Sequence, residues 1–225
     1  MAVTSKGTAA GLVDWRTVER LTALIPAGPS ASRSARASSV AVLRRSALEA
    51  PAWVARITGL NRAAQQVAET TRVSVVDRAG LVRVSTRALR GLMEQVPAPQ
   101  ASEAVRLVGA AEMAGAMSLL ATRLLGQVVP AAGTGADGDA GRGGEASPHL
   151  LLVAPNVLAM RRQLDLDMLD LPAWVCLHEM THAVQLAAAP WLGPYLSDSM
   201  RMVIGAVVEA VYGCLLYTSP SPRDR

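Results

Sequence analysis

The stretch PAWVCLHEMTHAVQ, which runs from Pro172 to Gln185, decides how the rest of the chain is interpreted. It contains the pattern H-E-x-x-H, formed by His178, Glu179 and His182. On an α-helix, residues four apart lie on one face and one turn apart, so both imidazoles can reach a single metal ion. Neutral imidazole nitrogen is a good ligand for zinc. We therefore expect His178 and His182 to bind Zn²⁺.

The carboxylate between the two histidines adds chemistry beyond metal binding. Glu179 follows the first histidine, so it projects beside a water molecule bound to the metal. There it can act as a general base and then pass the proton to a leaving amine. Zinc lowers the pKa of its bound water to about 7, which makes hydroxide available at neutral pH. We predict that Glu179 is the catalytic residue of a peptidase or amide hydrolase whose substrate is a peptide or another amide.

The sequence around the motif favours one helix. Asp170 and Pro172 resemble a helix start, because a carboxylate is stabilising near the positive end of a helix and proline is tolerated in its first turn. Pro190 provides a stop. On such a helix Cys176 faces away from the first histidine, so we interpret it as a buried thiol and not as a ligand. We expect His149, outside the helix, to be a surface histidine.

A third metal ligand is harder to identify. A metzincin motif would continue with Gly and His at the places that Gln185 and Ala188 occupy, and this excludes that class. The main candidate is Glu209, in the segment GAVVEAVYG, which loosely resembles the G-T-x-x-D-x-x-Y-G segment of aspzincins. The alternative is that Glu209 is an ordinary helix carboxylate.

Composition and charge narrow the class of protein. The chain has 225 residues, 51% of them hydrophobic, which suits one domain with a sizeable core. Its net charge of +4 comes from scattered arginines without a basic run, so we expect no nucleic-acid partner. Cys176 and Cys214 form no disulfide framework and no signal peptide is visible, so we expect a cytoplasmic protein. Nothing in the sequence indicates its oligomeric state.

The most apolar stretch, Leu107 to Ala132, contains Glu112 and Arg123. Charged residues inside a membrane span are costly, so a buried helix is favoured over a span. We therefore expect no membrane partner.

Hydrophobic spacing predicts several helices and few strands. The expected helices cover residues 12–24, 34–60, 85–96, 102–128 and 156–164. Pro51 should kink or interrupt the second of them. A strand should begin near Arg72 and end in a turn at residues 77–80, with Ser85 as the cap of the next helix. A second short strand is expected from Leu150 to Ala154, ended by Pro155.

Three segments are expected to lie outside the folded domain of residues 11–213. Residues 1–10 should be disordered. The Gly, Ala and Asp-rich segment 131–148 should be a flexible loop, since it cannot bury enough apolar surface to offset its ordering entropy. Residues 214–225 begin with CLLYTSPSPRD, which back-translates into a string resembling a transposase mosaic end and a library adapter. We therefore expect this tail to be an artefact and the natural protein to continue past Gly213.

Several stretches together resemble a zincin-like metallopeptidase family of high-GC bacteria. Many of its members are described as putative hydrolases or as associated with the biosynthesis of a deazaflavin coenzyme. The stretches are LLLVAPNVLAMRRQL (150–164), WVCLHEMTHAVQLAAAPWLGPYL (174–196), VDWRTVERLTALIPAGPSASRSA (13–35), VSVVDRAGLVRVSTRALRGLMEQV (73–96) and TRLLGQ (122–127). The V-A-P-N and P-W-L elements make the match narrower than H-E-x-x-H alone. The chain departs from the family at Leu186, where phenylalanine is common.

The resemblance implies a fold and a mechanism. The fold would be a zincin-like α+β domain, mainly helical with a small sheet, in which His178 and His182 bind zinc and Glu179 is the base. The family's third ligand would be a glutamate on a later helix, in a Glu-Gly context that this chain lacks. Leu150 to Pro155 would be the sheet edge that receives an extended substrate. The alternative is a non-catalytic zincin-fold scaffold or regulator linked to deazaflavin-coenzyme metabolism.

Overall fold

The structure is a computed structural model that describes the backbone of residues 6–130 and 148–218 and the side chains of residues 7–130 and 148–210. Of the segments expected to lie outside the folded domain, residues 1–5, 131–147 and 219–225 are not among the described residues. The helices are α1 (Trp15–Thr22), α2 (Arg33–Thr58), α3 (Asn61–Thr70), α4 (Arg78–Glu94), α5 (Glu103–Arg123), α6 (Ala154–Gln163), α7 (Asp170–Ala188), α8 (Leu192–Thr218) and the 3₁₀ helix η1 (Ala9–Leu12). The strands are β1 (Lys6–Thr8), β2 (Arg72–Val76), β3 (Pro97–Pro99), β4 (Gly126–Val129) and β5 (His149–Val153). The described chain is thus mainly helical with small sheets, which confirms the expected α+β class.

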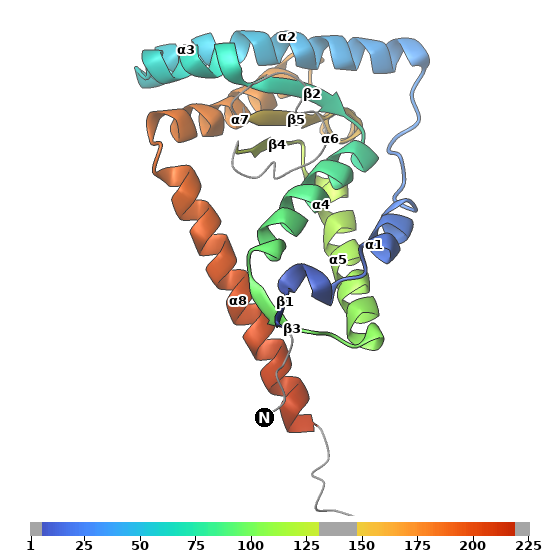
Figure 1. Cartoon of the computed structure of the whole chain (residues 1–225). Coiled ribbons are helices and arrows are strands. Elements are labelled where there is room, and N and C mark those ends of the chain that lie inside the picture. The colour runs from blue at the N-terminus through green and yellow to red at the C-terminus, as the bar shows by residue number, and fades with distance from the viewer. Residues whose placement is uncertain (1–5, 131–147, 219–225) are drawn as a thin grey trace, which may run out of the picture.

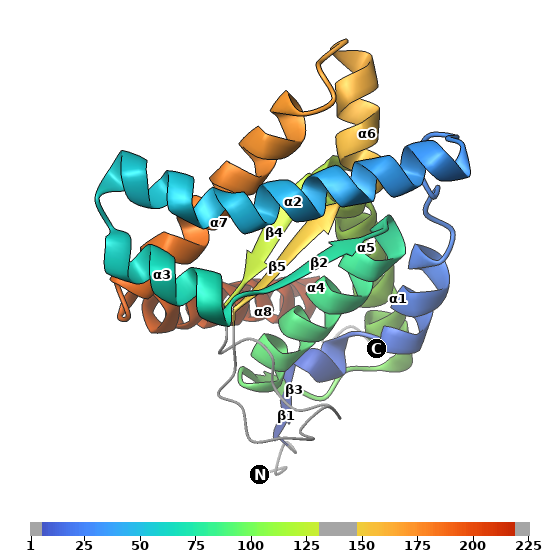
Figure 2. The same ribbon diagram turned by 90° about the horizontal axis from the view of Figure 1, so that it is seen from above.

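A three-stranded sheet lies between two layers of helices (Figure 1, Figure 2). Its strand order is β2-β5-β4, with β2 parallel and β4 antiparallel to β5. β5 is therefore the central strand, and four of its five residues are completely buried. Helices α2, α3 and α7 cover one face of the sheet, and α4 and α5 cover the other.

The alternation of side chains along β5 builds both layers of the core. Leu150 and Leu152 pack among the helices of the α2–α7 side, whereas Leu151 and Val153 pack on the α4–α5 side. All four side chains are completely buried. A strand that is apolar on both faces is typical of the middle of a covered sheet, since successive side chains point to opposite faces.

A separate group of buried side chains holds the N-terminal segment against α5 and α8. It includes Ala10, Val18 and Ala110, and the two-stranded sheet of β1 and β3 lies beside it. Among the described residues, α5 is the one helix long and apolar enough to cross a bilayer by length and composition. In the structure its inner side packs against α1 and α4, with Ala114 and Met117 buried.

The expected disorder of residues 1–10 is wrong for residues 6–10. Lys6–Thr8 pairs with Pro97–Pro99 as an antiparallel ladder, and Ala9 and Ala10 are buried in η1. The N–H of Ala9 also donates to the carbonyl of Val96 at 2.8 Å. Small side chains at these positions allow the backbone to approach its neighbours closely, which a composition-based expectation does not detect.

Two helices differ from the sequence-based expectation, one in its continuity and the other in its first residue. The long helix α2 continues through Pro51, which is buried, so its packing outweighs the lost backbone hydrogen bond. The expected turn at residues 77–80 is the first turn of α4. There the side chain of Asp77 accepts a hydrogen bond from the N–H of Gly80 at 2.6 Å. Asp77 rather than Ser85 is therefore the N-cap, as expected for an aspartate preceding a helix.

The expected sheet edge is also wrong. Residues 150–155 do not form an edge, because β5 lies between two other strands. The edge beside α7 is β4, and its first three residues, 126–128, were expected at the end of a helix over 102–128. That helix ends at Arg123, and pairing with β5 then stabilises Gly126–Val129 as a strand.

The packing of the core predicts that two leucines of α2 contribute very differently to the free energy of unfolding. Leu43 is completely buried and Leu48 is 79% exposed. Leu43→Ala should lower the free energy of unfolding by about 2–5 kcal/mol, because it leaves a cavity between α2 and α7. Leu48→Ala should change it by less than about 0.5 kcal/mol. Urea denaturation followed by circular dichroism measures both, and equal losses would contradict this packing.

Candidate metal centre

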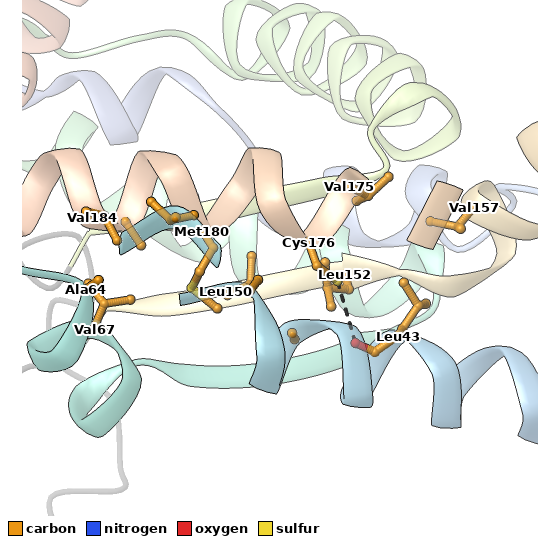
Figure 3. Close-up of a cluster of buried hydrophobic side chains, with 14 of the residues drawn as sticks. Leu43, Ala64, Val67, Leu150, Leu152, Val157, Val175, Cys176, Met180 and Val184 are labelled. Atoms are coloured by element: carbon orange, nitrogen blue, oxygen red, sulfur yellow. Dashed lines mark hydrogen bonds between the residues drawn. The ribbon is translucent and has the colours of Figure 1, made fainter. Parts of the chain in front are cut away.

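Helix α7 carries the motif and is held by its inner face (Figure 3). The helix begins at Asp170 and ends at Ala188, as the proline pattern predicted. Its buried residues recur at helical spacing and pack against α2, α3 and the sheet. They are Leu171, Pro172, Val175, Cys176, Glu179, Met180, Ala183 and Val184. The inner face therefore orients the whole helix.

Cys176 belongs to this inner face, as expected, and not to the metal centre. Its Sγ donates to the carbonyl of Leu43 at 3.6 Å, shown by the dashed line in Figure 3. Burial and, to a smaller extent, the nearby carboxylate of Glu179 together raise the pKa of the Cys176 thiol to about 12. The thiol therefore stays protonated and serves as a packing group. Thr181 is likewise engaged locally, because its hydroxyl donates to the carbonyl of Leu177 at 2.7 Å.

The opposite face of α7 presents a polar and aromatic stripe. Trp174, His178, His182 and Gln185 are all exposed and follow one another along the same side of the helix. The Trp174 indole is stacked on the His178 imidazole, with ring centroids 5.3 Å apart and an angle of 17° between the rings. This stack limits the orientations that the His178 ring can adopt.

The two imidazoles point their Nε2 atoms toward one another. The Nε2 atoms of His178 and His182 are 3.3 Å apart, and the rings meet edge to face. Two nitrogens bound to one tetrahedral Zn²⁺ at about 2.0–2.1 Å would lie about 3.3–3.4 Å from each other. The pair therefore fits two positions of one tetrahedral zinc ion.

Gln185 restricts the second histidine through its other nitrogen. The Nδ1 atom of His182 lies 3.2 Å from Oε1 of Gln185. An amide oxygen only accepts hydrogen bonds, so this contact requires the proton on Nδ1 and leaves the lone pair on Nε2. Hydrogen bonds of this kind orient metal-binding histidines in proteins. In the sequence alone, Gln185 stands out only as a departure from the metzincin motif.

Glu179 lies between the buried and exposed faces of α7. It is only 9% exposed and lies against β4, where its Cγ closely approaches the backbone of Gly126. Burial raises the pKa of the Glu179 carboxyl, whereas the neighbouring His178 and His182 lower it. The net effect is a higher pKa, and a carboxylate that binds a proton more readily is a stronger base.

The structure does not bring Glu209 to the histidine pair. Glu209 is exposed on α8. Within residues 6–130 and 148–210, no group of three or more His, Cys, Asp or Glu side chains is close enough to hold a metal ion. Glu209 is therefore not the third ligand in this arrangement.

His149 also lies outside the pair, as the sequence predicted, but it is not a fully exposed histidine. It is half-buried at the start of β5, and its Nε2 lies 2.8 Å from the hydroxyl of Ser74 on β2. Burial lowers the pKa of His149, and the positive charge of Arg72 lowers it further. Its role in the described structure is to join two strands of the sheet.

Asn156, in the V-A-P-N element, holds the segment that leads into β4. Its side-chain amide donates to the carbonyls of Ala121 and Leu124 at 2.8 and 2.7 Å, and its oxygen accepts from Nε of Arg78 at 2.7 Å. The asparagine thereby satisfies carbonyl groups at the end of α5 that the helix itself leaves free. It links the start of α6 to the approach of the strand beside Glu179.

Fold and site together define the class: a mainly helical α+β domain whose motif helix presents H-E-x-x-H beside an edge strand. The family model for zincin-like metallopeptidases matches residues 13–211, and the chain belongs to that family. Membership supports a zinc-type hydrolase at the level of the class. No match was found among curated proteins or among solved structures. The associations with high-GC bacteria and deazaflavin metabolism stay predictions.

Cys176 should be unreactive in the folded protein. With a pKa of about 12, about one thiol in ten thousand is ionised at about pH 8, and only the thiolate is nucleophilic. Iodoacetamide should therefore leave Cys176 unmodified in the native state and alkylate it in concentrated urea. Peptide mass mapping measures both, and rapid alkylation of the native protein would contradict the buried position.

Proposed function

We propose that this protein is a zinc-dependent peptidase or amide hydrolase in which His178 and His182 hold the metal and Glu179 is the general base. One observation carries the proposal: the two Nε2 atoms are 3.3 Å apart, with the Glu179 carboxylate held next to them on the same helix. A carboxylate in that place is needed for hydrolysis and not for metal binding. Family membership supports the same class of reaction.

Each residue of the proposed site would then have its own role. Zinc, when bound, would act as a Lewis acid and make its water more acidic. Glu179 would take a proton from the attacking water and deliver it to the leaving nitrogen, and its raised pKa suits both transfers. Gln185 would keep the Nε2 lone pair of His182 available, and Trp174 would limit rotation of His178.

We infer that the third protein ligand comes from outside the described side chains. The pair alone leaves more open positions than the single one that catalytic zinc sites usually keep. The described side chains, residues 7–130 and 148–210, contain no third ligand beside the pair. This observation also favours the second candidate function, a non-catalytic zincin-fold scaffold or regulator.

We also propose that the substrate binds as an extended chain along β4. Among the described residues this strand is one of the two edges of the three-stranded sheet, and it is the edge that lies beside α7. An unpaired strand edge presents N–H and C=O groups that can pair with an extended peptide. A peptide paired with β4 would pass next to Glu179, because the first residue of β4 contacts that side chain.

Glu179→Gln tests the catalytic role. The amide keeps the shape of the side chain but cannot accept the proton of the attacking water. We expect kcat to fall about 10²- to 10⁴-fold, while the zinc content determined by mass spectrometry stays that of the parent. The measurement is cleavage of a peptide library by the purified, zinc-loaded protein.

His178→Ala is the matched control for the Glu179 test. It should lose both zinc and activity, because it removes a proposed ligand. Parental activity in the Glu179→Gln variant would refute the peptidase mechanism. If no peptide or amide is cleaved and both variants behave like the parent in partner binding, the scaffold function is supported instead.

Gln185→Leu tests the orientation of His182. Losing the hydrogen bond to Nδ1 should weaken zinc binding about 10- to 100-fold, as measured by competition with a coloured chelator. Gln66→Leu, an exposed glutamine on α3, is the control and should leave zinc affinity unchanged. Equal affinities in the two variants would show that Gln185 does not orient the histidine.

A further inference from the structure

Gly126 lies where the motif helix meets the edge strand, and its lack of a side chain has a specific geometric consequence. A Cβ atom placed on Gly126 would lie 2.6 Å from Cγ, 3.0 Å from Cδ and 3.1 Å from Oε1 of Glu179. The first of these distances is shorter than real Cβ contacts allow. The Glu179 side chain therefore occupies the volume that any other residue at position 126 would fill.

The backbone of Gly126 cannot easily move away from Glu179. Gly126 pairs with Leu152 in the ladder between β4 and β5. Just before it, the carbonyl of Leu125 accepts a hydrogen bond from the N–H of Val153 at 2.9 Å, and the carbonyl of Leu124 accepts one from Asn156 at 2.7 Å. The strand is thus held along the side that faces β5.

The helix that carries Glu179 is also held in place. Its neighbour on the helix, Met180, is buried in the core between α7 and the sheet, and so is Val175 one turn earlier. These contacts fix the distance between α7 and β4, because packed interiors tolerate little displacement. Overlap at position 126 must then be relieved by the Glu179 side chain itself.

We propose that Gly126 is a positioning residue for Glu179. Because position 126 carries no side chain, the Glu179 side chain can lie in the space beside β4. The glycine is not required here for a left-handed backbone, because its φ lies outside the range that favours glycine. Other described glycines with an equally close neighbour face different groups. Gly28 meets Pro155 and Gly109 meets the carbonyl of Leu12. At Gly126 the neighbour is the acidic side chain of the motif.

The first test measures stability and does not depend on metal or activity. Gly126→Ala should lower the urea midpoint of the metal-free protein, since the new methyl group overlaps Cγ of Glu179. In a Glu179→Ala background that Cγ atom is gone, so Gly126→Ala should no longer lower the midpoint. Gly7→Ala is the matched strand control, because its Cβ would meet only an ordinary contact at 3.4 Å.

The second test concerns catalysis and rests on the proposed function. Gly126→Ala should lower kcat at least about tenfold by displacing the base, while zinc affinity stays within about threefold of the parent. Gly7→Ala should leave both unchanged. Loss of zinc together with activity would instead indicate that the methyl group disturbs the whole helix, and this would overturn a specific role in placing Glu179.

The two tests separate this inference from the proposed function. If Gly126→Ala shifts the urea midpoint equally in both backgrounds, the contact with Glu179 is not what the glycine accommodates, and the proposal is refuted. If the shift depends on Glu179 but Glu179→Gln keeps full activity, Gly126 places the carboxylate and the peptidase mechanism is wrong. Parental kcat in Gly126→Ala, with Glu179→Gln inactive, would refute the positioning role.

Discussion

The candidate centre depends on the burial of β5 on both of its faces. Leu150 and Leu152 support the layer that contains α7, and Leu151 and Val153 support the layer that contains α4 and α5. β5 also pairs on one side with β4. One short strand thus determines both the distance of the motif helix from the sheet and the register of the edge strand beside it, because a shift by one residue would exchange the two faces.

Helix α7 packs against the core with one face and presents the histidine pair on the opposite face. Its inner face is apolar and packs against α2 and α3, while its outer face presents Trp174 and the two histidines. Glu179 lies at the boundary, buried enough to be a stronger base yet adjacent to the exposed imidazoles. A carboxylate at such a position costs folding free energy, since burial disfavours its charged form. The packing of the inner face must offset that cost.

Sequence patterns predicted the features that rest on local spacing. The bounds of α7, the strand at β5 and the inward orientation of Cys176 all follow from helical or alternating periodicity. The errors at β1, at β4 and at the sheet edge lie where distant segments decide the outcome. Gly126–Val129 continues a helical composition and becomes a strand only because β5 is available to pair with it. Likewise, the neighbours of Gly126 and Asn156 are remote in sequence, so no spacing rule could reveal them.

Asn156 joins three helices through a single side chain, since it reaches the end of α5, the first residue of α4 and its own helix α6. Proteins open locally in cooperative units, and few contacts make a region easier to open. Release of the Asn156 amide would free the approach to β4 while the packing of α2 against α7 persists. The position of β4 beside Glu179 thus depends on a side chain outside the motif helix, whereas the helix that carries the histidines is held by its own core packing.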